Sequence, residues 1–129
     1  MNSASEDIKD ILADRSSLGL TFAKDLYYGK DVAKPDNTVT IFDTSGQPSQ
    51  LTLDKTKYDY TSVQIRVRNV DYDTGWALIS DIQDVLQGYS GTWNGTLYSV
   101  IYTASGPAFL DWDRNDRVRF IINFNVQRR

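Results

Sequence analysis

The stretch from Ser62 to Gln87 changes its hydrophobic period part-way along, and this constrains the fold more than any other feature. Val63, Ile65 and Val67 alternate with polar residues, which is typical of a half-buried strand. A second set of apolar residues follows at helical spacing: Leu78, Ile79, Ile82, Val85 and Leu86. A strand that leads directly into an amphipathic helix requires a sheet on which the helix can lie.

The remaining sequence predicts the rest of that sheet and a second helix. Ser5 precedes an acidic first turn and an apolar stripe, which indicates a short helix with Ser5 as its N-cap. Asn94-Gly95 predicts a tight hairpin turn, because both residues tolerate positive φ angles. Residues 117–127 alternate as a long final strand. Further strands are expected at residues 20–28, 38–42, 97–103 and 109–112, with a break at 105–107. These elements predict one α+β domain over residues 1–129: a mixed, mostly antiparallel sheet with two helices packed on one face and a protruding long loop or hairpin.

The protruding part is expected within residues 43–61, the least regular stretch of the chain. It contains Gly46, Pro48 and many Ser, Thr, Lys and Asp residues. One interpretation is a disordered surface loop. Because long structureless loops are uncommon in compact domains and are often functional, a hairpin or arm that contacts a neighbouring chain is equally compatible.

The composition excludes several classes of function. The formal net charge is −3 with a sequence pI of about 4.8, whereas a dedicated nucleic-acid binder is usually basic. There is no Cys and no His, which excludes thiolate zinc sites, Cys nucleophiles and the commonest general base. No apolar run approaches the length of a membrane helix, and the polar N-terminus does not resemble a secretory signal. A reducing cytoplasm is therefore the expected place of synthesis.

The acidic residues offer only weak candidates for chemistry. Residues 111–116 alternate oxygen ligands as a calcium loop does, but Asp116 and Ile122 stand where such a loop needs Gly and Glu, so a plain turn is favoured. Asp71 and Asp73 are expected to cap the central helix, while Asp81 and Asp84 lie off its apolar stripe. With no His to activate a serine, the sequence predicts no catalytic, cofactor-binding or metal-binding residues and no enzyme.

Four arginines form the one polar set with a possible role in binding. Alternation places Arg66 and Arg68 on the polar face of one strand, and Arg117 and Arg119 on that of another. Cross-strand pairing with nearby carboxylates is the favoured interpretation. The alternative is a basic strip that faces an acidic partner subunit or passing DNA.

The chain resembles a family of small structural proteins of long-tailed bacteriophages, the minor capsid or tail completion proteins, and is similar to tail terminators. The resemblance covers nearly the whole chain and lies in the order and spacing of these segments: SEDIKDIL, VTIFDTSGQPSQLTLD, YDYTSVQIRVRNVDYDTGWALISDIQDVLQG, NGTLY and SGPAFLDWDRNDRVRFIINFNVQRR. It implies a hexameric ring that caps the tail tube, stops its growth and provides the docking surface for the head connector. DNA passes through the ring without sequence-specific binding. The expected location is the virion, at the head–tail junction, after assembly in the host cytoplasm.

The resemblance carries over no functional side chains, so the interface residues are predicted from the strands and the long loop. The loop is expected to cross to a neighbouring subunit or to the tube, and the arginines to lie at an interface or near the channel. The predicted interface residues are Gln50, Leu51, Leu53, Lys55, Lys57, Tyr58, Tyr60, Arg66, Arg68, Arg117 and Arg119.

Three alternatives remain at this stage. A head-side neck protein, such as an adaptor or stopper, would bind portal assemblies and not tail tubes. A small carbohydrate-binding module would present Trp93, Tyr98 and Tyr102 on its surface. An enzyme that uses only carboxylates would need a pocket that joins distant Asp residues.

Overall fold

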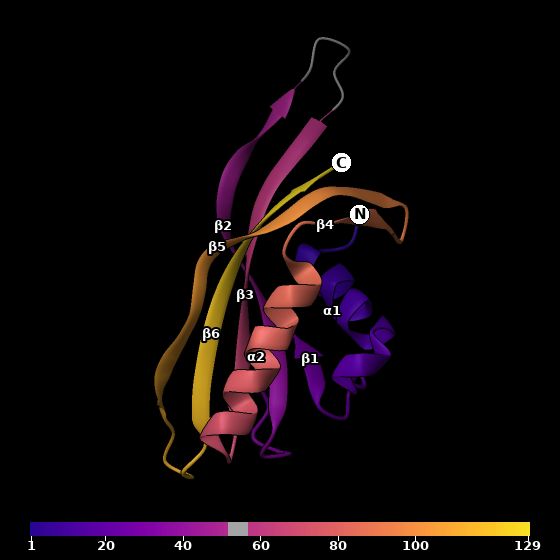
Figure 1. Cartoon of the computed structure of the whole chain (residues 1–129). Coiled ribbons are helices and arrows are strands. Elements are labelled where there is room, and N and C mark those ends of the chain that lie inside the picture. Colours follow the sequence, from indigo (N-terminus) through magenta and orange to yellow (C-terminus); the bar gives the residue numbers. More distant parts are fainter. Residues whose placement is uncertain (52–56) are drawn as a thin grey trace.

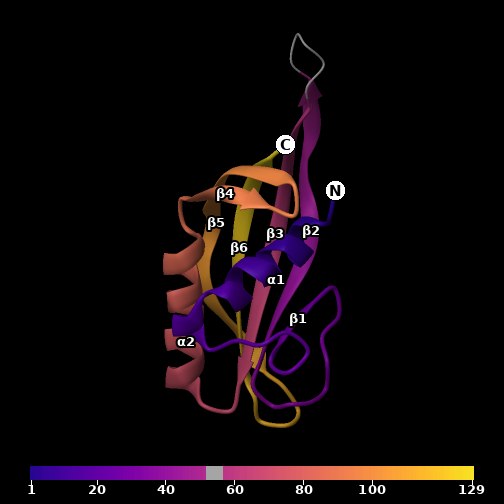
Figure 2. The same cartoon turned by 90° about the vertical axis from the view of Figure 1, so that its right-hand side faces the viewer.

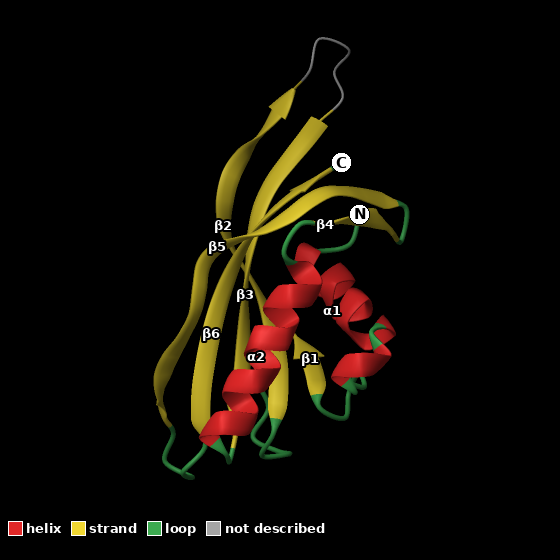
Figure 3. Cartoon of the chain, in the orientation of Figure 1, coloured by secondary structure: helices red, strands yellow, loops and turns green. Residues whose placement is uncertain are grey.

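The computed structural model describes residues 1–51 and 57–129, with the backbone alone at residues 47–51 and 57. Its elements are α1 (Ala4–Asp14), the 3-10 helix η1 (Ser16–Leu18), β1 (Leu26–Tyr28), β2 (Thr38–Leu51), β3 (Lys57–Asn69), α2 (Tyr72–Leu86), β4 (Tyr89–Trp93), β5 (Thr96–Trp112) and β6 (Val118–Arg128). Figure 3 shows how the two α-helices and the strands are distributed. In the described part of the chain, neither helix is long and apolar enough to cross a bilayer.

The strands form one six-stranded sheet in the order β1-β2-β3-β6-β5-β4 (Figure 1). The β1–β2 pair is parallel and the other four pairs are antiparallel, so the predicted α+β class with a mixed, mostly antiparallel sheet is confirmed. The central strand and helix are also confirmed. Asp71 caps α2 by accepting a hydrogen bond from the backbone N–H of Thr74 at 2.9 Å.

Alternation on β3 and β6 builds the core. Every second residue of β6 from Val118 to Val126 is buried, and so are Val63, Ile65 and Val67 of β3. The helices contribute Ile8, Ile11, Leu12, Ile79, Ile82 and Leu86 to the same apolar cluster. Figure 2 views the sheet from the helix side, with α1 crossing in front of it and α2 alongside. The opposite side chains of β3 and β6 therefore form a sheet face that lies away from the helical residues of the core.

The predicted Asn94-Gly95 turn is confirmed. Asn94 has φ 49° and Gly95 has φ 80°, and the turn joins β4 to β5. Both positive angles belong to the type I′ turn, whose twist matches that of the flanking strands.

The N-terminal predictions need two corrections. The helix begins at Ala4 with Ser3 as its N-cap, and Ser5 instead donates its hydroxyl to Asp43 at 2.7 Å. The strand predicted at residues 20–28 is limited to β1, because the Thr21 carbonyl accepts backbone N–H groups from residues 24–26 and so forms a turn.

The stretch predicted to be irregular, residues 43–61, continues β2 and β3 in its described part. These strands pair as far as Leu51 opposite Lys57, with register shifts after Thr44 and after Gln47. Figure 1 shows both strands extending past the other four. Polar residues are stable here because the backbone groups of the two strands satisfy each other, which local sequence patterns do not reveal.

The break predicted at residues 105–107 is also wrong, because β5 runs continuously from Thr96 to Trp112. The strand absorbs Gly106 and Pro107 through register shifts against β6. Proline is tolerated because this part of β5 lies at an edge of the sheet, where a missing N–H breaks no ladder.

Gly75 has no side chain where α2 lies closest to β6. An added Cβ would come within 2.9 Å of the Phe120 ring and 3.2 Å of Asn69 Cβ. Although alanine gains helix propensity over glycine, we expect Gly75→Ala to lower the free energy of unfolding by about 1 kcal/mol or more through overpacking. Urea denaturation measures this, with Gly106→Ala as the control, since its Cβ meets nothing within 4 Å. A stabilised Gly75→Ala variant would contradict the close packing.

Candidate assembly interface

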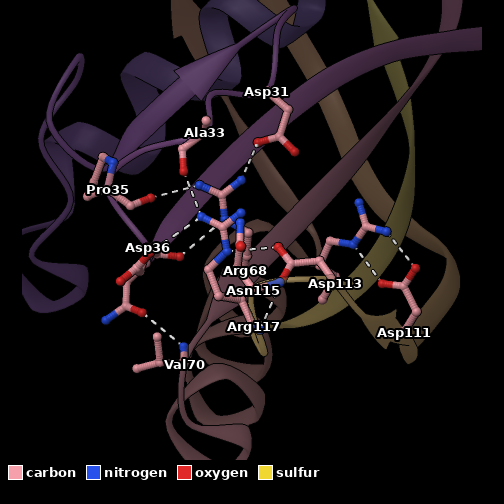
Figure 4. A network of polar contacts seen from close by, with 12 residues as sticks. Asp31, Ala33, Pro35, Asp36, Arg68, Val70, Asp111, Asp113, Asn115 and Arg117 are labelled. Carbon is pink, nitrogen blue, oxygen red and sulfur yellow. Dashed lines mark hydrogen bonds and ion pairs between the residues drawn. The ribbon is translucent and has the colours of Figure 1, made fainter.

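The four predicted arginines gather at one end of β3 and β6. Arg68 lies directly opposite Arg119 in the β3–β6 ladder, Arg66 lies opposite Ile121, and Arg117 immediately precedes β6. Figure 4 shows the carboxylates and carbonyls around Arg68 and Arg117. The structure therefore brings the four together, because the two strands that carry them are neighbours in the sheet, which alternation alone did not establish.

Arg68 is a buried residue that holds the connection between β1 and β2. Its guanidinium donates to the carbonyls of Pro35 at 2.7 Å and Asp36 at 3.2 Å, and forms an ion pair with Asp31 at 3.4 Å (Figure 4). Burial lowers the pKa of Arg68, and the negative charge of Asp31 opposes that effect. Because the guanidinium N–H groups donate to these acceptors within the subunit, few of them remain to bind another protein.

Arg117 is equally buried and joins the same connection to the turn before β6. Its Nε donates to Asp113 at 2.8 Å and its Nη1 donates to the Ala33 carbonyl at 2.6 Å. Asp113 also accepts backbone N–H groups from Asn115 and Arg117. Burial would raise the pKa of Asp113, but these hydrogen bonds outweigh it and lower the pKa overall. Asp113 thus accepts hydrogen bonds within a turn and from the Arg117 side chain. The sequence favoured such a turn over a calcium loop.

Arg119 forms a bidentate pair with Asp111 across the β6–β5 ladder. The Nε–Oδ1 distance is 2.6 Å and the Nη2–Oδ2 distance is 2.5 Å. The hydrogen bonds from Arg119 lower the pKa of Asp111 and, in turn, raise that of Arg119. This is the cross-strand carboxylate pairing that the sequence favoured.

The Arg119–Asp111 pair predicts a specific acid sensitivity. Because the folded pKa of Asp111 is depressed, its contribution to stability is complete above the unfolded pKa of about 3.9 and is lost as the pH falls further. Arg119→Met removes these hydrogen bonds, so we expect the variant to lose less stability than the wild type below about pH 4. Urea midpoints between neutral and acid pH measure this difference. If the urea midpoints of the wild type and of Arg119→Met fell equally with pH, the stabilising role of this pair would be contradicted.

Arg66 differs from the other three arginines. It stacks over Phe42, with 5.3 Å from the guanidinium carbon to the ring centroid, and donates to Gln64 at 3.2 Å. Among the described residues it has no carboxylate partner within ion-pair distance, and its buried Nε has no hydrogen-bond partner. Arg66 is thus the least neutralised arginine of the group.

The hairpin predicted as an arm is described only in part. Leu53 and Lys55 lie outside the described residues, and for Gln50, Leu51 and Lys57 only the backbone position within the strands is described. Tyr58 lies under the guanidinium of Arg129 at 5.2 Å, and Tyr60 accepts a hydrogen bond from Gln127 at 3.3 Å. Tyr60 also lines a pocket of about 240 Å³ together with Tyr102 and Asn125. The interface role of these residues remains a prediction.

Sequence patterns missed a second polar site, inside the fold. Tyr98 is fully buried and donates its hydroxyl to Asp7 of α1, which also accepts from Asn94 at 2.7 Å. Burial raises the pKa of Tyr98 well above its ordinary value. Since Tyr98 is buried, it does not share an exposed surface with Trp93 and Tyr102, contrary to what the carbohydrate-binding alternative needs.

Sequence patterns also missed an aromatic cluster at the start of α2. Tyr72, Trp76 and Phe109 surround Phe120, with ring centroids 5.0, 5.6 and 6.4 Å from it. Phe120 is buried, whereas the three surrounding side chains are 41–48% exposed. Tyr72 and Trp76 precede Ile79 by seven and three residues, so the helical spacing of the apolar stripe extends to them and was the available signal.

Comparison with known proteins gives the family. The model of the family described as "Bacteriophage tail terminator protein" matches residues 11–129. The chain belongs to this tail terminator family. It is accordingly a structural component of the phage tail. No curated protein matches the chain.

A solved structure shows that the fold recurs in another protein. A chain of the virion of a native gene transfer agent particle is similar, with a TM-score of 0.70 and 14% identity. The match covers 97% of this tail terminator family member and 93% of that chain. At this identity the likeness concerns the fold.

Proposed function

We propose that this single-domain protein assembles as a hexameric ring on the end of the tail tube, stops tube growth and presents the docking surface for the head connector. The observation that carries the proposal is the family match over residues 11–129. The likeness to a virion chain over nearly its whole length supports a part in a multi-subunit particle. Ring closure would use a heterologous contact repeated by rotation.

The hairpin of β2 and β3 supports a contact beyond the subunit itself. Both strands extend past the rest of the sheet (Figure 1), so they reach away from the core that fixes the subunit. In the proposal this arm, around residues 50–60, contacts a neighbouring subunit or the tube. Tyr58 and Tyr60 are its described aromatic side chains, and both are only partly buried.

The face of the sheet away from the core supports the passage of DNA. Its central side chains are amides and hydroxyls that bond across the strands: Ser62 to Asn125 at 2.8 Å, Gln64 to Asn123 at 3.3 Å and Asn123 to Ser105 at 2.8 Å. Strong binding to DNA requires many Lys or Arg contacts to phosphates. A face dominated by neutral groups lets DNA slide, so we propose that this face lines the channel.

The four arginines take different parts in this proposal. The buried arginines Arg68 and Arg117 fix the loop between β1 and β2, so in this proposal they act on the interface only indirectly. Arg66 and Arg119 are less buried and lie on the face proposed to line the channel.

Charge reversal at Arg66 tests the role of this face. Arg66 has no described carboxylate to neutralise it, so Arg66→Glu changes the charge of the face with little change to internal ion pairs. We expect ring formation or head joining to be impaired at unchanged secondary structure. Lys24→Glu, which reverses an exposed charge in the turn before β1 and away from this face, is the control for charge reversal alone. Intact rings that join heads normally would remove Arg66 from the proposal.

Polymerisation of tail tubes tests the function itself. Tail tube protein is assembled with increasing amounts of this protein, and the tubes are measured by electron microscopy. A terminator is expected to limit the tube length and to occupy one tube end only. Tubes that keep lengthening, with the protein binding portal complexes instead, would move it to the head side of the joint as an adaptor or stopper.

A further inference from the structure

Most of the exposed apolar side chains belong to two segments that lie beside each other, the start of α2 and the strand β5. Nine large hydrophobic residues are exposed in the described part of the chain, and seven of them lie within residues 70–76 and 102–112. These seven are Val70, Tyr72, Trp76, Tyr102, Phe109, Leu110 and Trp112. Such a concentration is typical of a contact surface between proteins.

This surface includes an open edge of the sheet. β4 pairs with β5 only between Thr96 and Ile101, and the side-chain oxygen of Gln87 accepts the next outward N–H, that of Thr103, at 2.7 Å. Beyond Thr103, no strand in the described chain pairs with the outer edge of β5. Open edges are templates for pairing with another strand.

The opposite edge of the sheet is open as well. β1 pairs with β2 only from Val39 to Ile41, and the N–H of Gly29 satisfies the Ile41 carbonyl at 2.8 Å. From Phe42 onward, no described strand lies against the outer edge of β2. Each subunit therefore has two open edges, which suits a head-to-tail contact between copies.

The two edges match in direction. β2, β3, β6 and β5 are successively antiparallel, so β5 and β2 run in opposite directions. When a second copy lies beside the first in the same orientation, its β2 edge meets the β5 edge as an antiparallel pair. Antiparallel pairing is slightly more stable per residue than parallel pairing.

The two open edges are displaced along the strands by an amount that is compatible with a closed ring. Ala108, near the middle of the β5 edge, pairs with Ile121 of β6, which in turn pairs with Arg66 of β3. Gln47, on the β2 edge, pairs with Tyr60 of β3, six residues before Arg66. Six residues on β3 correspond to about 20 Å, and four strands are about 19 Å wide. Aligning the edges therefore tilts the strands by about 45°, close to the tilt of about 35–45° found in closed sheets.

On the basis of the proposed ring, we infer that the β5 edge from Ala104 to Trp112, with Tyr72 and Trp76 beside it, receives the β2 edge of a second copy. The sheets then join into one continuous wall around the channel. Pro107 and Pro48 lie on these two edges and each removes an N–H group. When Ala108 is aligned with Gln47, Pro107 lies opposite Pro48, so we expect the hydrogen-bonded stretches on either side of this pair. Such short stretches discourage indiscriminate aggregation.

Cross-linking tests this contact directly, because the natural chain has no Cys. Ser45→Cys and Leu110→Cys proteins are mixed, alone and on purified tail tubes, and treated with a short bis-maleimide. We expect a linked heterodimer from the mixture, and no linked product from either variant alone, since a head-to-tail contact does not bring identical residues together. Asp81→Cys, on the exposed face of α2, replaces Leu110→Cys in the control mixture and is expected to give no product.

A charged residue introduced on the β5 edge gives a second test of the contact. We expect Leu110→Glu to reduce ring formation at least tenfold at an unchanged Tm, and Asp81→Lys to leave it unchanged. Rings that form without the Ser45–Leu110 link, or that tolerate Leu110→Glu, would overturn this contact while leaving the proposed function intact. Absence of any ring, both in solution and on tubes, would overturn the contact and the proposed function together.

Discussion

Phe120→Ala is expected to lower the free energy of unfolding by about 3–5 kcal/mol, the range for removal of a buried aromatic ring. Phe120 is fully buried in β6, lies between Val67 and Phe109 in the sheet, and contacts Tyr72 and Trp76 of α2 with its ring. Removal of the Phe120 ring leaves a cavity where α2 packs against the sheet. Chemical denaturation of the purified protein measures the change.

Phe109→Ala is the matched control for this cavity. Phe109 belongs to the same aromatic cluster but is 48% exposed, so most of its surface is already in water. We expect a loss of about 1 kcal/mol or less, together with impaired ring formation if the β5 edge is a subunit contact. Equal losses of stability for the two variants would show that the cluster does not divide into a buried centre and an exposed rim.

Arg117→Met is the second substitution with a large expected effect. Arg117 is 6% exposed and donates to Asp113 and to the Ala33 carbonyl. Removing Arg117 takes one donor from the partly exposed Asp113 and one from the Ala33 carbonyl, at a cost of about 1–3 kcal/mol. We therefore expect the variant to unfold at a markedly lower urea concentration than the wild type.

Two further variants separate the charge from the geometry. Arg114→Met removes an exposed arginine from the same turn and is expected to change stability by less than about 0.5 kcal/mol. Arg117→Lys keeps the charge but loses the planar fork that reaches two acceptors, so an intermediate loss is expected. If Arg117→Met unfolded at the same urea midpoint as the wild type, the role of Arg117 in holding the β1–β2 connection would be contradicted.

The parts of the fold that were predicted correctly depend on local patterns. Alternation located the inward faces of β3 and β6, the change of period located α2, and Asn94-Gly95 located a hairpin turn. In each case the residues that carry the signal are neighbours in the chain. The physical cause therefore acts within a few residues.

The parts that were missed depend on contacts between distant segments. The polar strands around Thr44 and Tyr60 are stable through their mutual pairing, and β5 passes through Pro107 because it is an edge strand. Tyr98 is buried because Asp7, 91 residues earlier, accepts its hydroxyl hydrogen. No local pattern encodes these partners.

The arginine group lies between these two cases. Arg68 and Arg119 lie opposite each other in the β3–β6 ladder. Cross-strand pairing with nearby carboxylates was the favoured interpretation, and Arg119 forms such a pair with Asp111. The folding of the β1–β2 connection over Arg68 was not visible, because its main acceptors are backbone carbonyls of Pro35 and Asp36. Every residue type has a backbone carbonyl, so a site built from backbone acceptors cannot be recognised from residue types in the sequence.

Native mass spectrometry of the purified protein, alone and then mixed with tail tubes, tests the proposed ring most directly. We predict a hexamer, or subunits that bind only at tube ends. Because tail parts can remain monomeric until a template is present, the mixture with tubes decides the result. A monomer that ignores tail tubes and binds portal complexes would contradict the tail terminator role.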